Sequence, residues 1–131
     1  MKCLFCYQEL HDGEQHYHAA CAKRFFGSPV IPSMPYSQAD IRELAKQVVR
    51  SHTTVTGVQA KLSMDIEHTN QISRLTIVDQ GGKYILKPQT PQYPYLPEIE
   101  DLTMHLAQSV KIDVVPHALL RFDSGELCYL T

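Results

Sequence analysis

The feature that most constrains this chain is the spacing of cysteine and histidine in its first 21 residues. Cys3 and Cys6 are separated by two residues, and after a gap of eleven residues His18 and Cys21 repeat that separation. Two ligands on such a tight turn converge, and two turns brought together can complete a tetrahedral Zn²⁺ site. The sequence therefore predicts a structural zinc ion bound by Cys3, Cys6, His18 and Cys21.

Two other histidines lie between these pairs, but His11 and His16 do not keep the two-residue spacing. The alternative to a metal site is a set of free thiols with a surface histidine. Three of the four cysteines fall within 19 residues, which favours the metal. A closed site with four protein ligands stabilises a fold and leaves no open position for hydrolysis. The fourth cysteine, Cys128, lies in an apolar run and is predicted to be a small buried hydrophobe.

Composition limits the kind of protein this can be. A chain of 131 residues, 44% hydrophobic, can support one modest core beside a metal-binding head. The sequence has neither a run of about 18 apolar residues nor the pattern of a secretory signal, so we expect no membrane association and no export. Paired metal-binding thiolates suit the reducing cytoplasm. With 12 Lys+Arg against 14 Asp+Glu, the net charge of -2 argues against direct nucleic-acid binding.

The first half of the chain divides into a metal-binding module over residues 1–27 and a proline-rich linker with a helix over residues 28–50. Residues 22–26 favour a short helix that ends at Gly27, and three prolines between residues 29 and 35 favour an extended connector. Ser37 can then cap a second helix with Asp40. One face of this helix is predicted to pack in the core, and its residues are Ile41, Leu44, Ala45, Val48 and Val49.

The second half alternates apolar and polar residues with a period of two. Residues 62–66, 74–78 and 83–87 read as three strands of an antiparallel meander. A helix over residues 98–110 follows, and residues 114–122 and 127–130 form a hairpin around the turn at 123–125. The predicted class is therefore α+β. The apolar residues that should face the core from the later helix are Ile99, Leu102, Leu106 and Val110.

Three strands, a lysine in the third, and a helix that opens with glutamates are typical of the amino-terminal lobe of a protein kinase. In that lobe the strand lysine contacts nucleotide phosphates, and a helix glutamate holds the lysine. The chain has no G-x-G-x-x-G motif and no Walker loop, and its candidate phosphate loop is residues 53–61. The pattern alone leaves open that the strand lysine, Lys87, simply faces solvent.

Four segments carry a more specific signal: residues 54–61 (TVTGVQAK), 84–88 (YILKP), 93–100 (YPYLPEIE) and 124–129 (SGELCY). In order and spacing they resemble the amino-terminal kinase lobe of HipA-like serine/threonine kinases, including the HipT type. The resemblance covers residues 51–131, and some HipA-like proteins also begin with a cysteine-rich head. It implies a zinc-stapled module followed by a kinase-like N-lobe, without the C-lobe.

The resemblance also implies roles for individual residues. The loop over the ATP phosphates would contain Gly57, Val58, Gln59 and Lys61, and Lys87 would be the phosphate-binding lysine. Thr54 and Thr56 stand where relatives carry autophosphorylated serines. The family's Glu-Asn-Glu becomes Glu98-Ile99-Glu100.

Helix geometry separates the two glutamates. At 100° per residue Glu100 lies at the edge of the apolar face, whereas Glu98 falls beside Asp101 and His105 on the polar side. We therefore expect Glu100 to pair with Lys87. The alternative is that both glutamates only complement the helix dipole.

In the resembled kinases the catalytic aspartates lie in the C-lobe, so we expect no catalytic residue in this chain and no phosphate transfer by it alone. The complete enzyme would use ATP and Mg²⁺. The resemblance implies a bacterial toxin–antitoxin kinase with a HipB-like antitoxin and a protein substrate such as an aminoacyl-tRNA synthetase. The alternative is a stand-alone zinc-containing adaptor that docks a partner protein.

Overall fold

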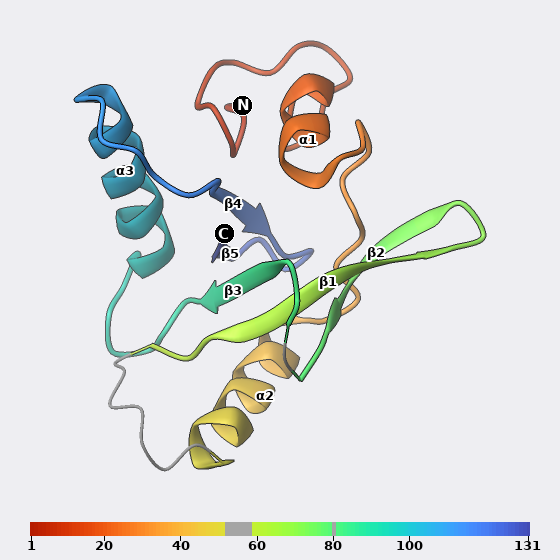
Figure 1. The fold of residues 1–131 in the computed structure, drawn as a ribbon, viewed down its shortest axis with the longest axis vertical. Coiled ribbons are helices and arrows are strands. Elements are labelled where there is room, and N and C mark those ends of the chain that lie inside the picture. Colours follow the sequence, from red (N-terminus) through yellow and green to blue (C-terminus); the bar gives the residue numbers. More distant parts are fainter. Residues whose placement is uncertain (52–58, 80) are drawn as a thin grey trace.

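The computed structural model describes residues 1–51, 59–79 and 81–131. The chain is of the predicted α+β class, with one five-stranded sheet and three helices in the described ranges. The cysteine-rich head and α1 lie on one side of the sheet, and α2 lies on the other (Figure 1). In chain order the elements are α1 (Ala19–Phe26), α2 (Gln38–Ser51), β1 (Leu62–Thr69), β2 (Ile72–Ile77), β3 (Tyr84–Pro88), α3 (Leu96–Ser109), β4 (Ala118–Arg121) and β5 (Leu127–Leu130). Among these described helices, none has the length and apolar character needed to cross a membrane.

The strand order is β2-β1-β3-β5-β4, and the paired strands are antiparallel. The predicted meander is wrong at β3, which pairs with β1 instead of β2, with Leu62 opposite Leu86. Gly82 explains how the chain can reach the edge of β1 with which β3 pairs. A β-carbon at this position would lie 2.3 Å from the carbonyl oxygen of Met64, and the Gly82 N–H donates to Ser63 Oγ at 3.0 Å. The absence of a side chain lets the segment before β3 pass directly over the β1 backbone.

The predicted hairpin forms β4 and β5, and β5 also pairs with β3, so that Tyr129 stands opposite Lys87. The first strand begins at Ala118, four residues later than expected. Gly125 turns the chain with a φ of 102°, which glycine adopts readily. Cys128 is buried in β5, as predicted.

Local capping signals are confirmed in the first two helices. The Asp40 N–H donates to Ser37 Oγ at 3.1 Å, and the Ser37 N–H donates to Asp40 Oδ2 at 2.8 Å, which satisfies both backbone groups at the start of α2. Ile41 and Ala45 are buried on the predicted face, whereas Val48 and Val49 belong to the part of α2 whose side chains are not described. Helix α1 starts three residues earlier than predicted and ends at Gly27 as expected.

The predicted core face of α3 is wrong. Ile99 is 55% exposed, Leu102 49% and Leu106 59%, whereas Asp101 on the same helix is completely buried. Polar contacts decide the orientation, because Asp101 accepts a hydrogen bond from the hydroxyl of Tyr7 and bonds to the ring of His117. Turning the apolar row inward would leave this carboxylate without those partners.

The head packs into the same core as the sheet. Its buried residues Cys3, Tyr17, Ala22, Phe25 and Phe26 belong to one cluster with the apolar side chains of the strands. The Leu119 N–H donates to the Leu4 carbonyl at 3.1 Å, and the Tyr84 hydroxyl donates to the Phe25 carbonyl at 3.1 Å. The fold therefore joins residues near the amino terminus to β3 and β4.

The orientation of α3 predicts the cost of substitutions. Leu106→Gln should change the free energy of unfolding by no more than about 0.5 kcal/mol, because the side chain is already in solvent and glutamine is a good helix former. Leu86→Ala in β3 should cost about 2–5 kcal/mol, because that side chain is fully buried. Urea unfolding of both variants tests this, and an equal loss in the two would show that α3 is turned the other way.

Candidate functional site

The head brings two pairs of metal-type ligands together. Cys3 and Cys6 lie on a tight turn in which the Tyr7 N–H donates to the Cys3 carbonyl at 3.0 Å. His18 stands immediately before α1, and Cys21 lies in its first turn. The ligand atoms of Cys3, Cys6, His18 and Cys21 all lie within 4.8 Å of one another. The structure therefore assembles the four predicted residues into a group that could hold a metal ion.

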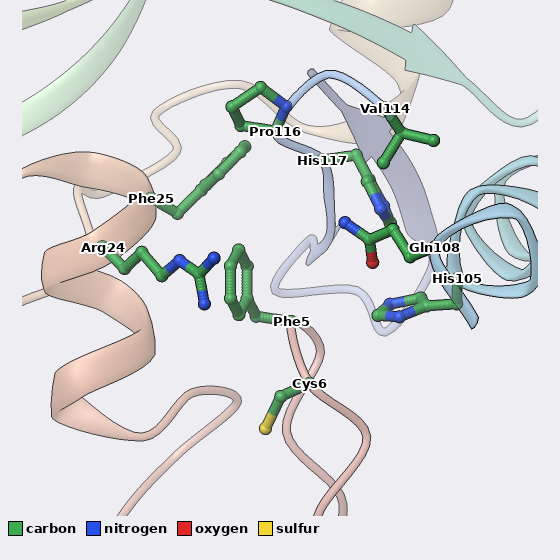
Figure 2. Close-up of a pocket in the computed structure, with 9 residues that line it drawn as sticks. All are labelled: Phe5, Cys6, Arg24, Phe25, His105, Gln108, Val114, Pro116 and His117. Atoms are coloured by element: carbon green, nitrogen blue, oxygen red, sulfur yellow. The ribbon is translucent and has the colours of Figure 1, made fainter. Parts of the chain in front are cut away.

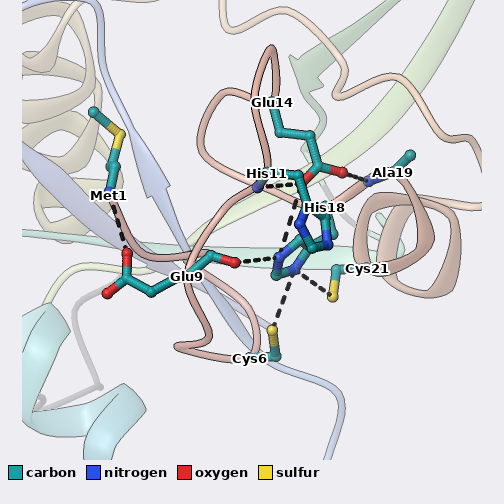
Figure 3. A network of polar contacts seen from close by, with 8 residues as sticks. All are labelled: Met1, Cys6, Glu9, His11, Glu14, His18, Ala19 and Cys21. Atoms are coloured by element: carbon teal, nitrogen blue, oxygen red, sulfur yellow. Dashed lines mark hydrogen bonds and ion pairs between the residues drawn. The ribbon is translucent and has the colours of Figure 1, made fainter.

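The distances within this group fit one tetrahedral ion. The Sγ atoms of Cys6 and Cys21 lie 3.4 Å and 3.7 Å from Nδ1 of His18 (Figure 3). Bonds of about 2.3 Å to sulfur and about 2.05 Å to nitrogen would place two tetrahedral ligands about 3.6 Å apart. The two distances bracket that value, so an ion fits with little movement of the side chains.

A hydrogen bond at one ring nitrogen of His18 orients the other ring nitrogen toward the candidate metal site. The His18 Nε2 lies 2.9 Å from the Glu9 carbonyl, to which it can donate (Figure 3). This bond raises the pKa of His18, and it leaves Nδ1 to face the sulfurs with its lone pair. Metal-binding histidines commonly donate their other N–H to a backbone carbonyl in this way. His11 and Glu14 form a second possible group with the same His18, whereas His16 joins neither group among the described residues.

The thiols are electrostatically suited to a cation. Burial disfavours ionisation of Cys3, but backbone hydrogen bonds from Cys6, Phe5 and His18 outweigh it and lower the pKa of that thiol. Burial, together with the neighbouring thiols of Cys6 and Cys3, raises the pKa of Cys21 to about 12. A divalent ion at the centre would stabilise these adjacent thiolates.

The second candidate group lies between the sheet and α3. Lys87 extends from β3 and forms an ion pair with Glu100 of α3, and their side chains are 19% and 22% exposed. Lys87 Nζ also lies 5.3 Å from the ring centroid of Tyr129, and burial raises the pKa of that tyrosine to about 12. Lys87 pairs with Glu100, the glutamate we expected. The side of α3 that faces the sheet, however, is not the side we predicted. Glu98 forms no ion pair among the described residues, and its Oε2 is buried there without a hydrogen-bond partner.

The other predicted nucleotide-binding residues are only partly described. Gln59 Nε2 donates to the carbonyl of Pro88 at 3.5 Å, which places the end of the candidate phosphate loop next to Lys87. Lys61 is exposed immediately before β1. Gly57, Val58, Thr54 and Thr56 lie outside the described residues.

Sequence reasoning missed a polar cluster around Asp101. Nδ1 of His117 lies 2.6 Å from Asp101 Oδ1, the Tyr7 hydroxyl donates to Oδ2, and His105 Nε2 lies 3.4 Å from Oδ2. Burial, followed by the Asp101 carboxylate, raises the pKa of Tyr7. Burial lowers the pKa of His105, although Asp101 opposes that effect. The four-residue spacing of Asp101 and His105 is the one local signal that places them on a common face.

A pocket of about 550 Å³ opens between the head and this cluster. Phe5, Arg24 and Phe25 line it from the head, and His105, Gln108 and His117 line it from the other side (Figure 2). The Arg24 guanidinium lies 5.8 Å from the ring centroid of Phe5, so its charge is held against an aromatic face at the pocket wall.

Comparison with known proteins identifies the family. The model of the HipA-like C-terminal domain matches residues 53–131, which is more than half of the chain. A relative from Haemophilus influenzae (strain ATCC 51907 / DSM 11121 / KW20 / Rd), named "Putative kinase", is 33% identical over 95 residues, which are 72% of this chain and 26% of the relative. The chain thus spans about a quarter of that relative's length. It belongs to the HipA-like C-terminal domain family.

We expect protein purified without added metal to carry one divalent ion per chain, because the four ligand atoms fit one ion. Cys21→Ala should lower the content to near zero, whereas Cys128→Ala should leave it unchanged because that thiol lies in the core. His18→Ala compared with His11→Ala tests the choice of histidine. Elemental analysis after gel filtration is the measurement. A folded head without metal, or equal loss in the two cysteine variants, would contradict the assignment.

Proposed function

We propose that this chain is the nucleotide-binding lobe of a HipA-family serine/threonine protein kinase. The observation that carries the proposal is the Lys87–Glu100 ion pair between β3 and α3 in a chain of this family. In protein kinases a strand lysine contacts nucleotide phosphates, and a helix glutamate holds its ammonium group in place. Lys87 would bind the ATP phosphates, Glu100 would orient Lys87, and Gly57, Val58, Gln59 and Lys61 would cover the phosphates. ATP with Mg²⁺ would supply the phosphoryl group.

The metal of the head is proposed to be a structural Zn²⁺. Three thiolates and one imidazole are soft ligands that select zinc over magnesium or calcium. Four protein ligands leave no position for substrate, so Cys3, Cys6, His18 and Cys21 would stabilise the fold and take no part in phosphate transfer.

The wider role is inferred from the family resemblance. We propose a HipT-type kinase of a bacterial toxin–antitoxin system that acts in the cytoplasm. Its partners would be a HipB-like antitoxin and a protein substrate such as an aminoacyl-tRNA synthetase. In the proposed kinase the catalytic base and the Mg²⁺ ligands would belong to the C-lobe, as in other protein kinases.

A second candidate function, a protein-binding adaptor, is favoured by the exposed apolar row on α3. Ile99, Leu102 and Leu106 are each about half exposed, and contiguous apolar surface of this kind marks contact sites for other proteins. An adaptor that retains the fold would not need nucleotide. Failure of the folded, metal-loaded chain to bind ATP would favour this function over the first.

Nucleotide binding tests the role of the ion pair. Lys87→Ala should weaken binding of ATP with Mg²⁺ by about tenfold or more, because a charge-assisted contact is lost. Lys83→Ala is the matched control, since it removes the same charge from an exposed position one residue before β3. Glu100→Gln should weaken binding, whereas Glu98→Gln should have little effect. Calorimetric titration gives all four affinities. Equal effects within each matched pair would refute the assignment.

Kinase assays test whether the catalytic residues lie in the C-lobe. The 131-residue chain should show no kinase activity alone, whereas a kinase that contains this lobe and a HipA-family C-lobe should be active. Mass spectrometry of that kinase should find phosphate on Thr54 or Thr56 only when Lys87 is intact. Thr54→Asp with Thr56→Asp should weaken ATP binding, because added negative charge repels the nucleotide phosphates. Transfer by the chain alone, or two unmodified threonines in active enzyme, would overturn the corresponding assignment.

A further inference from the structure

Helix α3 holds two adjacent acidic side chains that have different partners. Glu100 reaches Lys87 in β3, whereas Asp101 reaches Tyr7 in the head and His117 immediately before β4. The two contacts lie one residue apart on a rigid helix. A shift of α3 that breaks the Asp101 contacts therefore also moves Glu100 relative to Lys87.

Few of the apolar side chains of this helix are fully buried. The buried residues of α3 are Pro97 and Asp101, and its row of large apolar side chains points to solvent. The polar contacts of Glu100 and Asp101 therefore act together with the packing of Pro97 in orienting the helix. Asp101, which is fully buried, joins the helix to the head, and the ring of His105 lies against Tyr7 beside it.

Tyr7 connects Asp101 to the metal ligands. It follows Cys6 directly, has a φ of 64°, and closes the turn by donating its N–H to the Cys3 carbonyl. Its hydroxyl donates to Asp101, and its ring centroid lies 4.2 Å from that of His105, one turn further along α3. The turn that presents two thiols to an ion therefore also presents Tyr7 to the helix.

The group of Asp101, His105 and His117 is better described as a hydrogen-bonded junction of Asp101 with His117 and Tyr7, beside which the His105 Nε2 has no hydrogen-bond partner among the described residues, than as a second metal site. Its ligand-type atoms lie within 4.8 Å of one another. However, His117 Nδ1 and Asp101 Oδ1 are 2.6 Å apart, whereas two ligands of one tetrahedral zinc ion would lie about 3.3 Å apart. The shorter distance is that of a charge-assisted hydrogen bond.

We propose that Tyr7 and Asp101 are positioning residues through which the cysteine-rich head holds α3 where Glu100 can pair with Lys87. Loss of the Tyr7–Asp101 bond loosens α3 and weakens the ion pair. The positioning itself is a property of the described fold, and its effect on ATP rests on the proposed function.

The test compares two tyrosines of the head. Tyr7→Phe removes the hydroxyl that bonds α3 and keeps the ring beside His105. Tyr17→Phe is the matched control, since it removes a buried hydroxyl that donates to the Leu119 carbonyl in β4. Amide exchange over residues 102–109 should quicken by about tenfold in Tyr7→Phe and stay unchanged in Tyr17→Phe. The ¹⁵N signal of the Lys87 ammonium group, a direct report on its pairing with Glu100, should shift in the first variant alone.

Asp101→Asn provides the second arm. It should quicken exchange and shift the Lys87 signal at least as much as Tyr7→Phe does, because it also weakens the contact with His117. Adding Tyr7→Phe to it should have a smaller effect on α3 than Tyr7→Phe alone has, because the two residues share one bond. Unchanged exchange and an unchanged Lys87 signal in both variants would overturn the proposal. So would equal changes in Tyr17→Phe, because the effect would then be general destabilisation.

ATP affinity separates this proposal from the proposed function. Altered α3 exchange and an altered Lys87 signal in a chain that binds no ATP would support the positioning role and refute the nucleotide role. Lys87-dependent ATP binding that Tyr7→Phe and Asp101→Asn leave unchanged, along with an unchanged Lys87 signal, would refute the positioning role and leave the function intact.

Discussion

The buried carboxylate of Asp101 is the constraint on which the arrangement of this fold depends. A charged group without solvent contact is costly unless it is paired and hydrogen-bonded. Asp101 meets that requirement with groups from two distant parts of the chain, the Tyr7 hydroxyl and the His117 ring. These partners lie 94 and 16 residues away, so one side chain fixes the head, α3 and the segment before β4 relative to one another.

This requirement competes with apolar burial in α3, and the two contributions are of similar size. Burying a leucine or isoleucine side chain is worth about 1.5–3 kcal/mol. An unpaired buried carboxylate costs several kcal/mol, and breaking a buried ion pair costs about 3–5 kcal/mol. Ile99, Leu102 and Leu106 are already about half buried, so turning them inward would gain about 2–5 kcal/mol in total. The same rotation would break the contacts of Asp101 with Tyr7 and His117. The helix keeps the carboxylate inside, and the apolar row remains as surface that another protein segment can cover.

The parts of the fold that could be predicted are those encoded by neighbouring residues. The spacing of Cys3, Cys6, His18 and Cys21, the Ser37–Asp40 cap and the turn before β5 each require contacts within a few residues or one short loop. The order of the strands in the sheet could not be predicted from such local contacts. Alternation identifies strands but not their partners, and the pairing of β3 with β1 depends on Gly82 packing against the Met64 carbonyl. The inward face of α3 was missed for a similar reason, since its decisive partner lies in the head.

The same distinction applies to the candidate site. Sequence patterns could mark Lys87 and Glu100, but a strand lysine can face either side of a sheet, and only the packing of α3 brings it to a carboxylate. That packing depends on the head, which is too short to bury an independent core. Its side chains Cys3, Tyr17 and Phe26 instead complete the core of the sheet, and the metal-type ligands close the loops that carry them. The cysteine-rich segment is therefore structurally part of the fold that holds Lys87, and Tyr7 connects its first turn to α3.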